Sequence, residues 1–360
     1  MKTLKLLGTV LIFAAGIFGQ SVSGELFPIY EGGKYGLIDR TGKVVVEPTF
    51  TTILGSDDSA DLFLTVAVDT FEVKKSNKRW GLINRAGEWA VPPQFDDAGP
   101  FHEGYAVVRE NGKYKYINEK GEVLTGGFDY AKTFSEGLAV VNVGGKWGYI
   151  DLTGRVAIPL QYSRPEPYGP SMKQSSPISS FSEGLAGVEI GGRNAYINKA
   201  GTIVLWLPKG VNGADFSEEY AVVWQWNSAR AIFEYGLIDK TGKLVIPMVH
   251  RHLFEVSEGL VGYQSGLKFG FLSTSGSPVI EAKFDRVEEF ASGRAKVKIG
   301  EKYGFIDHTG WFVIPPIFDA ASSFFDGLAS VDIGDAEYYI DTSGNVVYPV
   351  GAKLELKSER

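Results

Sequence analysis

Short apolar stretches recur along the chain, each followed by a tight turn and a second stretch of the same kind. Leu138–Val143 is apolar except for Asn142, and Gly144 and Gly145 separate it from Lys146–Asp151. A short apolar run bounded by turn residues indicates a β-strand, and a two-residue glycine turn favours a hairpin. After the first twenty or so residues no long stretch has the period of an amphipathic helix. The pattern therefore predicts antiparallel β-hairpins.

The hairpin register predicts which side of each sheet forms the core. A two-residue turn places Ala139 opposite Ile150 and Val141 opposite Gly148 on one face. Equivalent positions in other copies stay small or apolar, whereas the alternate positions also take Lys, Ser and Asp. We expect the Ala139 face to be buried, and Gly148 to let a neighbouring unit approach closely.

This hairpin belongs to a unit that occurs nine times. Each copy has an Ile or Leu anchor, and successive anchors lie 45, 34, 33, 47, 41, 34, 34 and 34 residues apart. The basic period is 34 residues, and the three long steps contain insertions around 56–78, 163–180 and 224–233. We expect loops or extra hairpins there. The anchors are Ile38, Ile83, Ile117, Ile150, Ile197, Ile238, Leu272, Ile306 and Ile340.

A turn signal follows every anchor. Asp, Asn or Ser comes directly after it, and Gly comes three residues later in all nine copies. The polar side chain can accept backbone N–H bonds and Gly can adopt positive φ, as type I turns require. An apolar strand then often ends in Pro, and a Phe-Asp turn and an acidic-Gly corner lead to the next hairpin. Each unit is thus predicted to be a meander of three short strands.

The linked motifs resemble the WG repeats of bacterial proteins, also called KWG repeats. The resemblance rests on strings such as Lys-Trp-Gly-Tyr-Ile-Asp at 146–151, Pro-Pro-Gln-Phe-Asp at 92–96 and Phe-Ser-Glu-Gly-Leu-Ala-Val-Val at 134–141. It covers nearly all of the chain after the N-terminal segment and implies an interaction scaffold with no common ligand. Copies with Lys115, Ala195 and Tyr338 lack the signature Gly.

The repeat length favours one architecture over another. A four-stranded propeller blade usually takes about 40 to 45 residues, so that 34 fits three strands better. We therefore expect an all-β tandem array of three-stranded antiparallel units, elongated or curved like a solenoid. A closed propeller-like ring is the alternative.

The two ends of the chain differ from the repeats. Residues 1–24 combine Lys2 and Lys5, an apolar run over 6–18 and small residues near 23, which predicts a signal peptide rather than a retained membrane anchor. Nine repeats then fill 25–350, and 351–360 form a charged tail. Pro28 falls in the first strand, where a missing N–H is tolerated only at an edge. We expect an exported protein, periplasmic, cell-surface or secreted, with no membrane span in the mature chain.

The amino-acid composition makes some classes of partner and of chemistry unfavourable. Without the two signal lysines the formal charge becomes −9 instead of −7, which makes a nucleic acid an unfavourable partner. There is no Cys, so neither disulfides nor a cysteine nucleophile can contribute. The 13% aromatic residues and 45 Gly suit short strands and tight turns.

Two tryptophans are the candidate ligand-binding residues. Trp224 and Trp226 are two residues apart in the sixth copy and so share one face of a strand. Exposed, they could stack on a sugar or a peptide. The structural alternative is that the adjacent insertion folds over both rings.

Other candidate chemistry is weaker. His250 and His252 could share a strand face, but no third metal ligand is identifiable, and the repeated Asp of the turns is explained by capping. Adjacent acids such as Glu288 and Glu289 point to opposite faces of a strand, and no catalytic motif occurs. We therefore expect no enzyme, no metal and no cofactor. The preferred function is an extracytoplasmic scaffold for protein–protein interaction, with a cell-envelope glycan-binding protein as the alternative.

Overall fold

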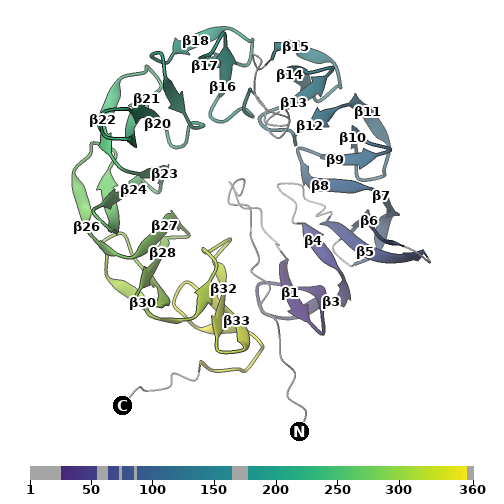
Figure 1. The fold of residues 1–360 in the computed structure, drawn as a ribbon. Coiled ribbons are helices and arrows are strands. Elements are labelled where there is room, and N and C mark those ends of the chain that lie inside the picture. Colours follow the sequence, from purple (N-terminus) through teal and green to yellow (C-terminus); the bar gives the residue numbers. More distant parts are fainter. Residues whose placement is uncertain (1–25, 55–63, 73–74, 85–86, 164–176, 355–360) are drawn as a thin grey trace.

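The computed structural model describes residues 26–54, 64–72, 75–84, 87–163 and 177–354, which form a ring of β-sheets (Figure 1). These residues make nine antiparallel sheets of three or four strands. No helix in this part of the chain is long and apolar enough to cross a membrane. The all-β class is confirmed. The expected signal peptide at 1–24 lies outside the described residues, as does most of the expected tail.

We call the sheets blades 1 to 9 in chain order. They consist of β1 (Phe27–Glu31), β2 (Lys34–Ile38), β3 (Val44–Phe50); β4 (Thr52–Leu54), β5 (Leu64–Glu72), β6 (Lys75–Ile83), β7 (Trp89–Phe95); β8 (Asp97–His102), β9 (Tyr105–Glu110), β10 (Lys113–Ile117), β11 (Val123–Phe128); β12 (Tyr130–Ala131), β13 (Leu138–Val143), β14 (Lys146–Asp151), β15 (Val156–Tyr162); β16 (Leu185–Ile190), β17 (Arg193–Asn198), β18 (Ile203–Trp206); β19 (Val211–Gly213), β20 (Tyr220–Asn227), β21 (Ile232–Asp239), β22 (Leu244–His250); β23 (Leu253–Ser257), β24 (Leu260–Ser265), β25 (Lys268–Ser273), β26 (Pro278–Phe284); β27 (Arg286–Ala291), β28 (Arg294–Ile299), β29 (Lys302–Ile306), β30 (Phe312–Phe318); and β31 (Ala320–Ala321), β32 (Leu328–Ile333), β33 (Ala336–Asp341), β34 (Val346–Tyr348).

Each blade is a meander that runs from the central opening to the outer rim (Figure 1). In the four-stranded blades the first and innermost strand is short, between the two residues of β12 and the six of β8. This strand forms where the sequence predicts only a Phe-Asp turn and a corner. Because it adds so few residues, four strands fit into a 34-residue repeat. The expectation of an elongated array of three-stranded units was therefore wrong, and the chain forms the alternative, a closed ring.

The turns after the anchors have the predicted chemistry. In blade 1, Asp39 Oδ1 accepts hydrogen bonds from the backbone N–H of Thr41 at 2.8 Å and of Lys43 at 3.2 Å. Gly42 closes the turn with φ of +82°, a conformation that L side chains rarely adopt. These bonds hold the pKa of Asp39 below its usual value, with the Thr41 hydroxyl as the largest cause. The repeated Asp is therefore turn capping.

The hairpin register agrees with the prediction, but the core is larger. Ala139 pairs with Ile150 and Val141 with Gly148, and this face is buried against blade 3. Tyr149, on the opposite face, is also fully buried, because that face packs against blade 5. Sheets in a ring have a neighbour on both sides. The prediction that the Ala139 face is core is confirmed, and the opposite face is core as well.

The signature Gly allows a close approach within its own blade rather than between blades. A Cβ at Gly148 would lie 2.6 Å from the carbonyl oxygen of Ile158 in the outer strand β15. The pairing of β14 with β15 shifts register at this point. The bulged outer strand contains Pro159, and it forms the edge of the sheet, where a missing N–H leaves no ladder hydrogen bond unmade.

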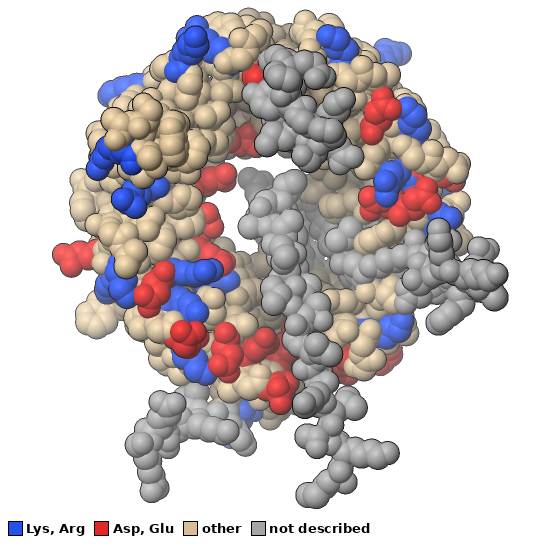
Figure 2. Space-filling view, viewed as in Figure 1, with Lys and Arg blue, Asp and Glu red and all other residues tan. Residues whose placement is uncertain are grey.

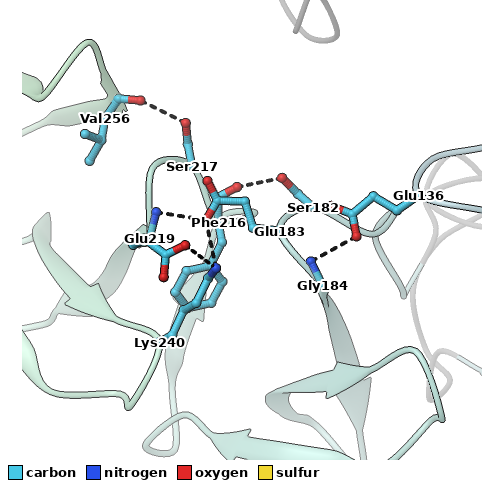
Figure 3. Close-up of polar contacts among 9 residues, drawn as sticks. All are labelled: Glu136, Ser182, Glu183, Gly184, Phe216, Ser217, Glu219, Lys240 and Val256. Atoms are coloured by element: carbon cyan, nitrogen blue, oxygen red, sulfur yellow. Dashed lines mark hydrogen bonds and ion pairs between the residues drawn. The ribbon is translucent and has the colours of Figure 1, made fainter. Parts of the chain in front are cut away.

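The acidic-Gly corners join neighbouring blades, and we call these links corner contacts (Figure 3). Glu136 of blade 4 accepts a hydrogen bond from Gly184 N of blade 5 at 2.9 Å. In blade 5 the corresponding corner contains Ser182 and Glu183. Ser182 donates its hydroxyl to the carbonyl of Phe216 in blade 6 at 2.6 Å. Glu183 in turn accepts from Glu219 N at 2.8 Å. The same motif that starts each hairpin therefore also binds it to the next blade.

The same kinds of contact close the ring between blades 9 and 1. Phe27, Ile29 and Ile38 of blade 1 share a buried cluster with Leu328 and Tyr339 of blade 9. Blades 1 and 9, which lie side by side in the ring (Figure 1), therefore meet through an apolar core.

Polar contacts across this junction follow the repeat as well. Arg40 of blade 1 forms an ion pair with Asp326 of blade 9. Lys199 of blade 5 pairs in the same way with Glu136 of blade 4 at 3.1 Å. The junction between blades 9 and 1, which we call the seam, is thus built like a junction between two successive repeats.

The first strand has a special edge. β1 is the edge of its three-stranded sheet, as predicted for a strand containing Pro28. The carbonyl of Pro28 accepts a hydrogen bond from the Tyr339 hydroxyl at 2.6 Å. In blade 4 the equivalent carbonyl, that of Val140, accepts from Lys132 N of the inner segment. In blade 1 the Tyr339 hydroxyl of blade 9 therefore takes the place of the backbone N–H that the inner segment donates in blade 4.

Candidate binding surface

The insertion around 224–233 lengthens the hairpin of blade 6. β20 and β21 have eight residues each, against five or six in the corresponding strands of blades 3, 4, 5, 7, 8 and 9. Asn227 pairs with Ile232 at the end of the ladder, and its side chain accepts from Ala229 N at 3.1 Å in the turn. The insertion is an extra length of hairpin, one of the two forms expected, and it does not fold back over the strands.

The two predicted tryptophans have different environments. Trp226 is 54% exposed and contacts Phe233, its cross-strand partner, edge-on with ring centroids 5.0 Å apart. Trp224 is half-buried and stacks on Tyr235 at 6.1 Å, next to the core between blades 6 and 7. Trp226 and Phe233 thus form an exposed apolar ridge, which Trp224 and Tyr235 support from below.

The aromatic contacts continue from blade 6 to blade 7. His252 contacts Tyr235 at 5.1 Å and Phe254 at 4.6 Å, and Phe254 reaches Phe269 at 6.0 Å. Burial lowers the pKa of His252 below its usual value, which favours the neutral imidazole. We define the aromatic surface as Trp224, Trp226, Phe233, Tyr235 and His252.

The two histidines do not lie on one strand. His250 ends β22 and contacts Tyr263 at 6.2 Å, whereas His252 lies beside β23 of the next blade. Burial lowers the pKa of His250 as well. Across the described ranges no three His, Cys, Asp or Glu side chains are grouped so that they could hold a metal ion.

A second feature is acidic and lies inside the ring. Acidic side chains gather along one side of the central opening (Figure 2). Asp215, Glu255 and Glu289 come from the inner segments of three successive blades, 6 to 8, and we call them the acidic inner wall. Desolvation by the surrounding protein raises the pKa of all three, and in Glu255 the charges of the other two add to this effect.

The sequence did not predict this wall. Glu289 belongs to an adjacent acidic pair, whose other member, Glu288, accepts from the Ser323 hydroxyl at 2.6 Å and pairs with Lys296 at 2.8 Å. The other two acids occur singly. Only their equivalent position, directly before the buried residue of each inner segment, could have indicated a common location.

Comparison with known proteins agrees with this architecture. The model of the WG containing repeat matches residues 35–58, 80–114, 116–147, 147–168, 235–266, 269–303 and 303–335, more than half of the chain. The chain belongs to the WG-repeat family. No protein among the curated ones matches the sequence.

Solved structures resemble this WG-repeat protein only in fold. A crystal structure of a eukaryotic initiation factor has a TM-score of 0.52 at 12% identity, over 73% of this chain and 79% of that one. BamB from Moraxella catarrhalis has a TM-score of 0.44 at 11% identity, over 81% of this chain and 96% of that one. The Dos1 propeller has a TM-score of 0.40 at 12% identity, with 77% and 88% covered. At such identities the likeness concerns the backbone, and the function must come from the sites of this WG-repeat ring.

Proposed function

We propose that this protein is a non-enzymatic scaffold outside the cytoplasm and binds a partner protein through the aromatic surface of blade 6. The observation that carries the proposal is the ridge of Trp226 and Phe233 at the end of the lengthened hairpin. Exposed Trp side chains beside supporting aromatic residues are typical of the residues that dominate protein interfaces. The neutral His252 adds no charge that a partner would have to desolvate.

The geometry favours a protein over a sugar at this surface. Trp226 meets Phe233 edge-on, so that the two rings form a ridge rather than one flat platform. A ridge fits a complementary pocket on a partner, whereas a sugar stacks on a flat ring face. Glycan binding stays the second candidate because Trp226 is exposed, which is the condition that the glycan hypothesis required.

The test compares two exposed tryptophans. The parent, Trp226→Ala and Trp311→Ala proteins are immobilised and exposed to envelope fractions, and captured proteins are identified and their affinities measured. Trp311 lies in the turn of blade 8 and is 77% exposed, so it controls for loss of any surface Trp. We expect a partner whose binding weakens about 30-fold, about 2 kcal/mol, in Trp226→Ala only. Equal binding by all three proteins would contradict the proposal.

A polysaccharide array distinguishes the second candidate. Selective loss of glycan binding in Trp226→Ala, without a protein partner, would replace the scaffold by a glycan-binding function. The location outside the cytoplasm rests on residues 1–24. Fusion of these residues to a reporter enzyme that is active only after export tests it, and an inactive, uncleaved fusion would contradict it.

A further inference from the structure

A pocket of about 240 Å³ opens between blades 5 and 6 at the inner side of the ring, away from the aromatic surface. Blade 5 contributes Ser179, Gly187 and Asn194, and the chain leading to blade 6 contributes Leu207. Two charged side chains also line it, Lys132 from blade 4 and Asp215 from blade 6.

The pocket exists because blade 5 has smaller side chains than its neighbours. Gly187 pairs with Tyr196, whereas the same Tyr position faces Val107 in blade 3 and Val140 in blade 4. Asn194 stands where blade 4 has Trp147. The missing volume is therefore local to blade 5 and follows from the sequence.

The two charges of the pocket do not neutralise each other directly. Among the described residues Lys132 and Asp215 form no ion pair, although each affects the other's pKa. Desolvation lowers the pKa of Lys132 and raises that of Asp215. A ligand that brings the complementary charge to each of them would favour the ionised forms of both.

The polar groups that line the pocket fit one class of ligand. Asn194 lines the pocket and donates through Nδ2 to Val211 O at 3.0 Å and to Asn212 Oδ1 at 3.1 Å, so that its Oδ1 is the atom that can accept from a ligand. Asp215 adds a carboxylate, so an ammonium group finds two acceptors. Lys132 offers an ammonium to a carboxylate at the other side.

We propose that this pocket binds a small zwitterion, an α-amino acid with a small apolar side chain. At about 30 Å³ per water the pocket has room for about eight waters, or a ligand of similar size. The carboxylate of the amino acid pairs with Lys132, its ammonium pairs with Asp215 and Asn194 Oδ1, and its side chain lies against Leu207. The site is independent of the proposed partner-binding function.

Ligand chemistry provides the first test and needs no variant. Calorimetric titrations of the parent protein use L-alanine, L-valine and L-leucine, together with N-acetyl-L-valine and L-valinamide, each of which lacks one of the two charges. We expect saturable binding of at least one free amino acid, and binding at least about tenfold weaker for both blocked forms. No binding by any free amino acid, or equal binding of the blocked forms, would overturn the proposal.

A cavity-filling variant provides the second test. A Cβ at Gly187 would meet only Ser179 Oγ at 3.5 Å and Tyr196 Cε1 at 3.9 Å, both ordinary contacts. Gly187→Val recreates the Val–Tyr pair of blades 3 and 4, so it should fold while its side chain occupies the pocket. We expect it to lose amino-acid binding with an unchanged or higher Tm. Retained binding at the parent affinity would overturn the proposal.

Charge variants locate the two ends of the ligand. Asp215→Asn and Lys132→Met should each weaken binding of the free amino acid about tenfold or more. Glu289→Gln removes an acid of the same inner wall that does not line the pocket, and should leave the affinity unchanged. Equal weakening in Glu289→Gln would show a general effect of charge and overturn the assignment.

Discussion

The most deeply buried side chains of blade 4 lie between two blades rather than within one. Ile150 is 1% exposed and shares a cluster with Val107 and Tyr116 of blade 3. Tyr149, its neighbour in the chain, faces the other way and donates its hydroxyl to the Ser179 carbonyl at 2.7 Å. Because adjacent residues of one strand hold different neighbours, a single blade contributes to two junctions.

Ile150→Ala should lower the free energy of unfolding by about 2 to 5 kcal/mol, since it leaves a cavity at the junction of blades 3 and 4. Val156→Ala is the matched control, because Val156 is 56% exposed in the next strand. Thermal and denaturant unfolding measure both variants. An Ile150→Ala protein as stable as the control would show that this junction is not part of the core.

Among the elements, the corner between the inner strand and the hairpin has two roles. It reverses the chain, with Glu136 at φ of +55°, and it carries the carboxylate that reaches the next blade. Lys240 extends this network, since it contacts both Glu183 at 3.2 Å and Glu219 at 2.7 Å (Figure 3). Turn geometry and blade packing therefore depend on the same few residues.

Glu136→Ala should destabilise the protein by about 1 to 2 kcal/mol, because Gly184 N loses its acceptor and Lys199 loses its partner. Glu136→Gln keeps an acceptor oxygen and should lose less. Glu122→Ala serves as control, since the hydrogen bonds that Glu122 makes among the described residues stay within its own turn, to Asn118. Equal losses in the two alanine variants, measured by urea unfolding, would remove the corner contact as a source of stability.

Local parts of the fold could be predicted from the sequence, whereas contacts between repeats could not. The pairing of Ala139 with Ile150 follows from a two-residue turn, and the positive φ of Gly42 follows from turn chemistry. The inner strand β12 has two residues, too few to show a period. The acceptor role of Glu136 depends on Gly184, 48 residues away, and no local pattern contains that information.

The candidate sites show the same division. The position of Trp226 on one strand face with Trp224 could be predicted, but the difference in their exposure depends on packing against blade 7. Lys132 and Asp215 line one pocket only because blades 4, 5 and 6 follow the curve of the ring. An elongated array, which the sequence favoured, does not predict that these two residues lie near each other.

For the whole molecule, closure gives each of the nine small sheets a packed neighbour on both sides. A single blade has no second layer against which to bury its apolar faces, so that its core forms only between blades. Blades 9 and 1 supply the last junction through the cluster around Tyr339 and the Arg40–Asp326 pair. No strand is exchanged across this seam within the described residues.

Small-angle scattering of the chain from residue 25 should give a radius of gyration of about 20 Å, the value for a compact chain of this length. The central opening would raise it slightly. An open stack of nine sheets about 10 Å apart would be about 90 Å long and would give a clearly larger radius. Such a radius, measured at several protein concentrations, would show that the seam is open in solution.

The seam has a practical consequence for the order of the chain. The seam consists of side-chain contacts between complete sheets. It is therefore equivalent to the junctions between blades that are joined by the polypeptide chain. Joining the ends with a short linker and starting the chain at Gly210, in the exposed turn between blades 5 and 6, should therefore give a circular permutant with the same ring. In such a permutant blade 1 would lie in the interior of the sequence. The shape of the molecule would then not depend on which residue comes first in the chain.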